Sequence, residues 1–317
     1  MVFRAHFQPV EAEPLSTATE TTVTVIIPSR GGMLLERAVE SVLAQKSATV
    51  EVIVALNGAV RIPVFEDSRV RVIQSRAEDG ANGARQAGIN DATTPLVALL
   101  DDDDYWEPTK LRAQLDALGD LDIAHPWIVG CRLVEHRDPV RQTIAPRFGI
   151  GPVADIGSYL FRRPKWKSDR PQLQTSTILF PASLGRKVQF QASRRFHQDW
   201  TWLLDAESVG ARAYVVPETL VHRNVQSAGS ISSKITWEDS LNWADEFIKD
   251  PRVFGDFALT MGALKAARTN DRIALRRCFV RGIRKGRPGI PAVAFWLSLY
   301  LRLLRQGRGA NKNGTQS

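Results

Sequence analysis

The stretch PLVALLDDDDYW, residues 95–106, joins an apolar segment to four consecutive aspartates. Its apolar half has the length and composition of a buried β-strand. Neighbouring carboxylates repel one another by about 4 kcal/mol per pair at an effective dielectric constant near 20. Such a cluster is stable only where water solvates it or where a bound cation offsets its charge. A solvated acidic turn and a metal site are the two interpretations that the stretch itself leaves open.

The segments before this stretch alternate between strand and helix patterns. β-Branched runs at 22–28, 50–56 and 69–74 predict strands, and apolar residues at helical spacing predict a helix over 33–45. This alternation predicts an α/β fold with a mainly parallel sheet. Ligands of such sheets bind beyond the carboxyl ends of the strands, and the four aspartates lie at such an end.

The second half of the chain has a weaker pattern. Frequent Gly, Pro and Arg in residues 127–170 predict loops and short strands over a substrate cleft. A strand is predicted over 176–181, a helix over 199–210 and another strand over 212–217. From residue 236 the pattern is helical to about residue 305.

Composition limits the class of protein. The chain has 317 residues, 44% of them hydrophobic, which is enough for one large domain or one domain with an appendage. Only Cys131 and Cys278 are present, so a reducing compartment is the simpler assignment. Because residues 1–20 lack an apolar run and no segment reaches about 18 apolar residues, we expect neither a signal peptide nor a membrane span. The expected location is the cytoplasm.

Most of the positive charge lies in the C-terminal tail. Residues 272–317 contain eleven Lys or Arg and no acid, whereas the rest of the chain holds 31 basic and 34 acidic residues. The first 270 residues lack the basic face with aromatic platforms that a nucleic-acid partner requires. The basic tail, with its apolar run at 290–304, suits an interfacial helix on an anionic membrane. A packed helical hairpin and a partner interface are the alternatives.

Four segments follow one another along the chain: TVTVIIPSRGG (22–32), VEVIVALNG (50–58), the stretch from Asp79 to Leu111, and HQDWTWLLDA (197–206). Together they resemble the nucleotide-sugar-dependent glycosyltransferases of family 2. The resemblance implies the A-type glycosyltransferase fold, a Rossmann-like, mainly parallel sheet with helices on both faces. The expected organisation is a flexible arm (1–21), a glycosyltransferase domain (22–235) and a helical basic C-terminal extension (236–317). Within the domain, 22–125 would be the nucleotide-sugar and metal half and 126–235 the acceptor half.

The resemblance also implies a site for the donor. It assigns Mg²⁺ or Mn²⁺ to Asp101 and Asp103, with Asp104 as a supporting acid and His222 as a further metal ligand, unless His222 is a plain core histidine. Asn57 stands where the family often has an aspartate that contacts the base. The positions implied in donor binding are Pro28, Ser29, Arg30, Asn57, Arg85, Asp101 and Asp102.

The catalytic base implied by the resemblance is Asp199, which opens a helix in the acceptor half; Gln198 replaces the glutamate that often precedes it. A helix-capping role is the alternative for Asp199. Trp200 and Trp202 would stack on a sugar or belong to the core, and a downstream Ser-x-Ser of the family resembles Ser230 and Ser232.

The function implied is inverting transfer of a sugar from a nucleotide-diphospho-sugar to a hydroxyl of a glycan or lipid-linked acceptor, in polysaccharide biosynthesis. Two other classes remain open. A nucleotidyltransferase on a related fold would also place aspartates at a strand end, and a degenerate, non-catalytic nucleotide-sugar binder is suggested by Leu56, Asn57 and Gln198. Hydrolysis of the donor discriminates between the three classes.

Overall fold

The computed structural model describes residues 21–58, 62–120, 125–137, 140–147, 150–153, 155–163, 171–194, 196–225 and 235–312. The predicted N-terminal arm, except residue 21, and the Ser230–Ser232 pair lie outside these residues.

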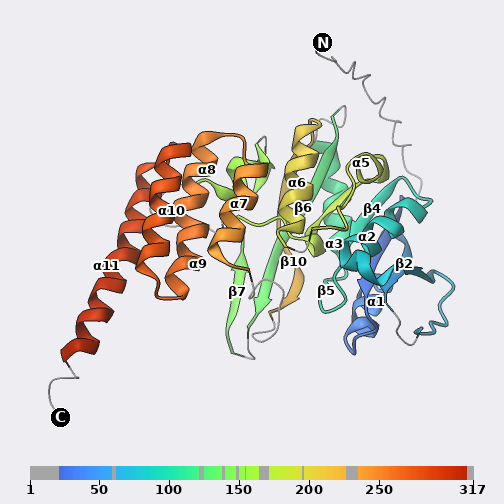
Figure 1. Cartoon of the computed structure of the whole chain (residues 1–317). Coiled ribbons are helices and arrows are strands. Elements are labelled where there is room, and N and C mark those ends of the chain that lie inside the picture. Colours follow the sequence, from blue (N-terminus) through green and yellow to red (C-terminus); the bar gives the residue numbers. More distant parts are fainter. Residues whose placement is uncertain are drawn as a thin grey trace.

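One mixed sheet forms the centre of the molecule (Figure 1). Within the described residues it has ten strands, in the order β3-β2-β1-β4-β9-β6-β10-β5, with β7 paired to β6 and β8 to β10. The neighbours β3, β2, β1 and β4 run parallel, as the alternating pattern predicts. The strands are β1 (Thr22–Ser29), β2 (Thr49–Asn57), β3 (Val70–Ser75), β4 (Leu96–Leu99), β5 (Tyr105–Trp106), β6 (Trp127–His136), β7 (Gln142–Ala145), β8 (Gly151–Val153), β9 (Leu179–Pro181) and β10 (Arg212–Asn224).

Helices cover both faces of the parallel part of the sheet. Val25 and Ile27 of β1 pack in one hydrophobic cluster and Ile26 packs in the other, because successive side chains of a strand point to opposite faces. Gly88 lets one helix approach β1 closely, since a Cβ there would lie 2.5 Å from Ile26 Cγ2. The helices and 3-10 turns of the first 225 residues are α1 (Leu35–Leu43), η1 (Ala77–Asp79), α2 (Gly80–Asp91), α3 (Lys110–Asp116), η2 (Ala117–Asp120), α4 (Ile156–Phe161), η3 (Thr175–Thr177), α5 (Ala182–Lys187) and α6 (Gln198–Ser208).

The second half differs from the sequence-based expectation at helix α4, which lies within the predicted loops, at β10, which continues past residue 217 to Asn224, and in two further segments. Residues 127–136, expected as loops and short strands, form the ten-residue strand β6, which is buried between β9 and β10. The predicted strand over 176–181 begins instead as the 3-10 turn η3, and only Leu179–Pro181 joins the sheet as β9. Hydrogen bonds within the turn, such as Thr177 N to Gln174 O at 2.8 Å, replace sheet pairing at the start of this segment.

The C-terminal extension is a group of helices at the end of the molecule far from α1 and β2 (Figure 1). Its elements are α7 (Trp237–Phe247), α8 (Pro251–Phe257), the π-helix η5 (Ala258–Gly262), α9 (Ala263–Arg268), α10 (Arg272–Lys285) and α11 (Ile290–Lys312). Trp243 and Phe257 of the extension belong to the same hydrophobic cluster as Phe161 and Trp202 of the second half. The extension therefore shares a core with the domain before it.

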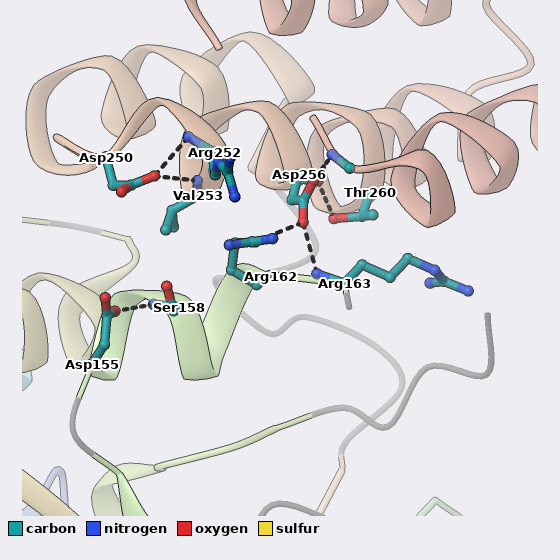
Figure 2. A network of polar contacts seen from close by, with 10 residues as sticks. Asp155, Ser158, Arg162, Arg163, Asp250, Arg252, Val253, Asp256 and Thr260 are labelled. Carbon is teal, nitrogen blue, oxygen red and sulfur yellow. Dashed lines mark hydrogen bonds and ion pairs between the residues drawn. The ribbon is translucent and has the colours of Figure 1, made fainter. Parts of the chain in front are cut away.

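A buried carboxylate fastens the extension to the end of α4 (Figure 2). Asp256 is fully buried and its Oδ2 accepts hydrogen bonds from Arg162 Nε at 3.2 Å and from Arg163 N at 2.9 Å. Its Oδ1 accepts from Gly289 N, between α10 and α11, at 2.7 Å. These three donors satisfy a charge that burial would otherwise disfavour strongly.

Candidate active site

The four aspartates follow β4 at the carboxyl end of the parallel strands. Ser29 ends β1 and Asn57 ends β2, so these two residues and the aspartates lie at one edge of the sheet. Asp104 N donates to Asp101 O at 3.1 Å and closes the aspartates into a tight loop. Both sequence-based alternatives, a solvated turn and a metal site, depend on what each carboxylate contacts.

Asp101 is paired with a buried arginine. Arg85 of α2 donates from Nη2 to Asp101 Oδ1 at 2.6 Å. Burial opposes the charge of Arg85, but the carboxylates of Asp101, Asp199 and Asp102 outweigh it and raise the pKa of the guanidinium. Arg85 Nη1 also reaches Gln198 Oε1 at 3.3 Å, at the start of α6. The arginine therefore lies between the strand-end loop and the helix that carries Asp199.

Asp102 is held by the end of the first strand. Its Oδ2 accepts a hydrogen bond from Ser29 Oγ at 2.5 Å, and Ser29 Oγ in turn accepts from Gly31 N at 2.9 Å. The backbone of Arg30 also hydrogen-bonds Asp102, while the Arg30 side chain is exposed. Burial raises the pKa of the Asp102 carboxyl and the charge of Asp101 adds to this shift, although the Ser29 hydrogen bond opposes it.

Asp104 is the most deeply buried of the four aspartates. Ser176 Oγ donates to its Oδ2 at 2.6 Å, and Asn224 N donates to its Oδ1 at 3.1 Å. Burial, followed by the charge of Asp101, raises the pKa of the Asp104 carboxyl far above its usual range. Its carboxylate oxygens therefore stabilise the loop through buried hydrogen bonds and do not face solvent.

Asp103 differs from its neighbours because its carboxylate receives no side-chain hydrogen bond from the described residues. Its backbone carbonyl is the fixed group: Arg37 Nη2 donates to it at 3.3 Å, and Asn224 Nδ2 donates to it as well. Burial raises the pKa of the Asp103 carboxyl, and the charges of Asp101 and Asp102 raise it further. A cation would relieve both effects, so Asp103 has the chemistry of a metal ligand.

The donor set fits a hard divalent cation that shares its ligands with a substrate. No three His, Cys, Asp or Glu side chains of the described residues surround a common metal position. Mg²⁺ is usually held by one or two carboxylates plus waters and substrate phosphates rather than by an all-protein cage. Asp103 and Asp101 can supply those carboxylates, and oxygen-only ligation favours Mg²⁺ or Mn²⁺ over zinc.

His222 lies on β10 opposite Tyr105 and already has two polar partners. Its Nε2 is 2.6 Å from Glu107 Oε1, and its Nδ1 is 2.9 Å from His136 Nε2. Its ring stacks on Tyr105 with centroids 4.3 Å apart. Ligation of a metal by His222 stays a prediction, and it would require the imidazole to release one of these contacts.

Asp199 is the second residue of α6. The N-cap of this helix is His197, so Asp199 does not occupy the position from which aspartate caps a helix. The carboxylate lies near enough to Arg85 to raise the pKa of the guanidinium, which places it on the same side of the molecule as Asp101. Trp202 is buried, stacks on Phe190 and donates to Val188 O, so it is a core residue.

Three residues that hold the loop were not identified from the sequence: Arg37, Ser176 and Asn224. Each reaches the loop across a separation of at least 66 residues, from α1, η3 and β10. Pro28 and Asn57, which were identified, lie in β1 and at the end of β2. Nothing in the local pattern around Ser176 or Asn224 marks them, because their contacts depend on the order of the strands.

The loop of aspartates lies beyond the carboxyl ends of the parallel strands, where α/β proteins commonly bind their ligands. Residues 24–186, more than half of the chain, match the model of the family described as Glycosyl transferase family 2. The chain belongs to this family, as the resemblance predicted.

Two relatives and one solved structure show how far the similarity extends. The chain is 28% identical over 228 residues to the succinoglycan biosynthesis protein ExoO of Rhizobium meliloti (66% of this chain, 62% of ExoO). It is 30% identical over 102 residues to an Escherichia coli protein, UDP-Glc:alpha-D-GlcNAc-diphosphoundecaprenol beta-1,3-glucosyltransferase WfgD (30% of this chain, 40% of WfgD). The chain thus spans less than two thirds of the length of these relatives.

The fold is similar to that of S. aureus TarS 1-349, solved in complex with UDP-GlcNAc, with a TM-score of 0.55 and 14% identity over 90% of this chain and 92% of TarS 1-349. This similarity confirms the A-type glycosyltransferase fold. None of the described helices has both the length and the apolar composition needed to cross a bilayer.

Proposed function

We propose that the protein transfers a sugar from a nucleotide-diphospho-sugar to a hydroxyl of a glycan or lipid-linked glycan, with inversion at the anomeric carbon. The observation that carries this proposal is the double contact of Arg85, with Asp101 at 2.6 Å and with Gln198 at 3.3 Å. It joins the carboxylates suited to a donor diphosphate with the helix that bears Asp199. A transferase needs these two functions side by side.

The diphosphate of the donor would lie at the strand-end loop. A divalent cation, Mg²⁺ or Mn²⁺, would be held by Asp103 and Asp101 together with the diphosphate, and when bound it would offset charge on the leaving group. The backbone after β1, at Ser29 and Arg30, and the end of β2, at Asn57, would contact the nucleoside. Pro28 and Asp102 would hold this edge in place.

The acceptor would meet the donor at Asp199. In the proposed reaction the Asp199 carboxylate accepts the proton of the acceptor hydroxyl while the hydroxyl oxygen attacks C1 of the sugar. The bond between C1 and the diphosphate oxygen breaks, the nucleoside diphosphate leaves with the electron pair, and the configuration at C1 inverts. General-base assistance of this kind is typically worth 10²–10⁴-fold.

The relatives suggest the substrates. We propose a UDP-sugar as donor, because TarS was solved with UDP-GlcNAc and the name of WfgD specifies UDP-Glc. We propose an undecaprenol-linked glycan as acceptor, because the name of WfgD specifies such an acceptor, and a role in polysaccharide biosynthesis, as for ExoO. Asn57 offers an amide where an aspartate often contacts uracil, and its side chain can both donate and accept hydrogen bonds.

The C-terminal extension supports a location at the membrane surface. Six large apolar side chains are exposed on α10 and α11, and in α11 the spacing of Ile290, Leu297 and Leu301 places them on one face. Residues 272–317 carry eleven Lys or Arg and no acid. Apolar contact together with positive charge is the combination that binds anionic lipid, so we propose peripheral attachment to the cytoplasmic leaflet. The free thiols of Cys131 and Cys278 suit that compartment.

The test is a thermal-shift screen of nucleotide sugars with Mn²⁺, followed by a transfer assay with the donor that stabilises best. A ligand at 100 times its Kd raises the free energy of unfolding by about 2.7 kcal/mol. We expect a UDP-sugar to stabilise and to be consumed with release of UDP. Release of pyrophosphate from a nucleoside triphosphate would indicate a nucleotidyltransferase instead. Stabilisation without hydrolysis or transfer would indicate a degenerate binding protein.

A further inference from the structure

The first turn of α6, which carries Asp199, is held by a helix of the C-terminal extension. His197 Nε2 lies 3.0 Å from Ser240 Oγ of α7. From the same helix, Trp243 Nε1 donates to Thr201 Oγ1 at 2.9 Å. Ser240 is fully buried and Trp243 nearly so. Two buried polar contacts therefore connect α7 with the start of α6.

The backbone at this junction is unusual. His197 has a φ of 54°, in the left-handed region that residues other than glycine rarely adopt. Its carbonyl accepts hydrogen bonds from both Thr201 N at 2.9 Å and Thr201 Oγ1 at 2.8 Å. Such a conformation persists only where surrounding contacts fix it, and such residues concentrate at functional sites.

The direction of the contact between His197 and Ser240 follows from the other partners of the serine. Ser240 Oγ donates its proton to Thr236 O at 3.1 Å, so it accepts from His197 Nε2–H. Burial lowers the pKa of His197 to about 3, and the imidazole is therefore neutral at working pH. Its ring stacks on Trp200 with centroids 4.7 Å apart and planes within 10°. The imidazole of His197 is thus held by a hydrogen bond at its edge and by stacking on its face.

The position of Asp199 depends on these contacts between α7 and the first turn of α6. Within the described residues its side chain makes no hydrogen bond, so the position of the carboxylate is set by the backbone of the first turn of α6. That turn starts at His197, two residues earlier. On the other side, Gln198 contacts Arg85 and donates to Arg194 O at 2.9 Å.

We propose that α7 is part of the catalytic unit, with His197, Ser240 and Trp243 acting as positioning residues that aim Asp199 at the acceptor hydroxyl. This inference rests on the proposed function, because it takes Asp199 as the base. It gives the start of the extension a role in chemistry, separate from the membrane contact proposed for α10 and α11. Displacement of a catalytic group by about 1 Å can reduce a rate by 10²-fold, so loosening one contact should be measurable.

The test compares Ser240→Ala with Thr260→Val. Each variant removes one buried hydroxyl from the extension; Thr260 Oγ1, in η5, donates to the backbone carbonyl of Asp256 at the end of α8 at 2.6 Å. Ser240→Ala leaves His197 Nε2–H without its acceptor. The readouts are hydrogen exchange of the amides in residues 199–203, kcat for sugar transfer, and the affinity for the nucleotide with Mn²⁺.

We expect Ser240→Ala to speed exchange in residues 199–203 by about 10-fold and to lower kcat by about 10-fold, with nucleotide affinity unchanged. Thr260→Val should do neither. In an Asp199→Asn background, Ser240→Ala should lower kcat no further, because the base that it positions is gone. Unchanged exchange in residues 199–203, or equal kcat in the two single variants, overturns the inference.

Failure of the proposed function has a different signature. If the wild-type protein transfers sugar from no nucleotide-sugar donor, the proposed function is wrong. The exchange comparison does not use turnover, so it still decides whether α7 holds the first turn of α6.

Discussion

Arg85 Nη1 lies 3.3 Å from Gln198 Oε1, and this contact joins a helix of the nucleotide half to the helix that carries Asp199. The same guanidinium binds Asp101 and is buried. Its planar group serves both partners at once, which a lysine ammonium on a flexible stem does not reproduce. If the proposed function holds, a change at Arg85 should therefore affect both donor binding and the position of Asp199.

Arg85→Lys should weaken metal-dependent nucleotide binding and slow transfer, because a lysine ammonium cannot bind both Asp101 and Gln198 as the guanidinium does. We expect a loss of about 10-fold or more in kcat/KM, measured with saturating Mn²⁺. The control is Arg71→Lys, at an exposed arginine that pairs with Asp91 and that should stay within about 0.5 kcal/mol of the wild-type stability. Equal kcat/KM values for the two variants would show that Arg85 has no role in the proposed active site.

Asp103→Asn should abolish the part of nucleotide affinity that depends on a divalent cation. The carboxylate has no side-chain donor from the described residues, so its loss removes a metal ligand and leaves the loop intact. Calorimetric titration of UDP with Mn²⁺ and with EDTA checks this. Asp116→Asn, at an exposed residue paired with Arg112, is the control. A variant that keeps the difference between Mn²⁺ and EDTA would contradict the assignment.

Asp199→Asn should retain donor affinity and lose transfer by roughly 10²-fold or more, the scale of a lost general base. In the proposed function the loop after β4 holds the donor diphosphate, and the substitution does not change that loop. Asp205→Asn, on the same helix and bonded to Gln191, is the matched control and should transfer sugar at nearly the wild-type rate. Wild-type transfer from Asp199→Asn would place the base elsewhere.

The burial of Lys110 predicts that the free energy of unfolding of the protein depends on pH. It is fully buried, its Nζ lies 3.6 Å from the centre of the Trp106 ring, and burial lowers its pKa to about 7. An unfolded lysine has a pKa of about 10.4, so between these values Lys110 binds more protons in the unfolded state and its contribution to the free energy of unfolding rises with pH; Asp104, whose pKa is raised to about 8, contributes in the opposite direction below that pH. Below about pH 7 the amine is charged in both states and the penalty of burial is complete.

Lys110→Met should remove most of this rise and stabilise the protein most at low pH. Urea midpoints at pH 6 and pH 9 measure the effect for both proteins. If the variant keeps the wild-type difference between the two midpoints, another group causes it.

Leu297→Asp with Leu301→Asp should reduce binding to anionic vesicles without affecting the fold, because both side chains are exposed. Deleting α11 would be a poorer test, since Ala292, Leu299 and Leu303 of this helix are buried in the core. Cosedimentation with vesicles of anionic and of zwitterionic lipid measures binding. Val64→Asp is the control at a side chain that is 89% exposed in the first half. Unchanged cosedimentation would show that α11 faces a protein partner or solvent.

The sequence predicts the parts of the site that are local along the chain. A short apolar run followed by aspartates identifies β4 and its loop, and a helical pattern after His197 identifies α6. The support of the loop is not local: Ser176 and Asn224 reach it only because β9, β6 and β10 follow β4 in the sheet. Strand β6 was also not predicted from the sequence. Its ten residues contain a glycine and an arginine, and their burial depends on neighbouring elements that are distant along the chain.

Asp256 also sets a condition on the order of events during synthesis. Arg162 and the backbone N–H of Arg163 leave the ribosome about ninety residues before their shared acceptor exists, and Gly289 follows it by more than thirty. Strands β1 to β4 can pair while later segments are still being translated, but the loop after β4 gains its contacts with Ser176 and Asn224 only later. The end of α4 cannot reach its final bonding until α8 has emerged. A ribosome stalled between these points would hold a chain in which β1 to β4 have formed while the Arg162 guanidinium and the Arg163 N–H still lack their acceptor.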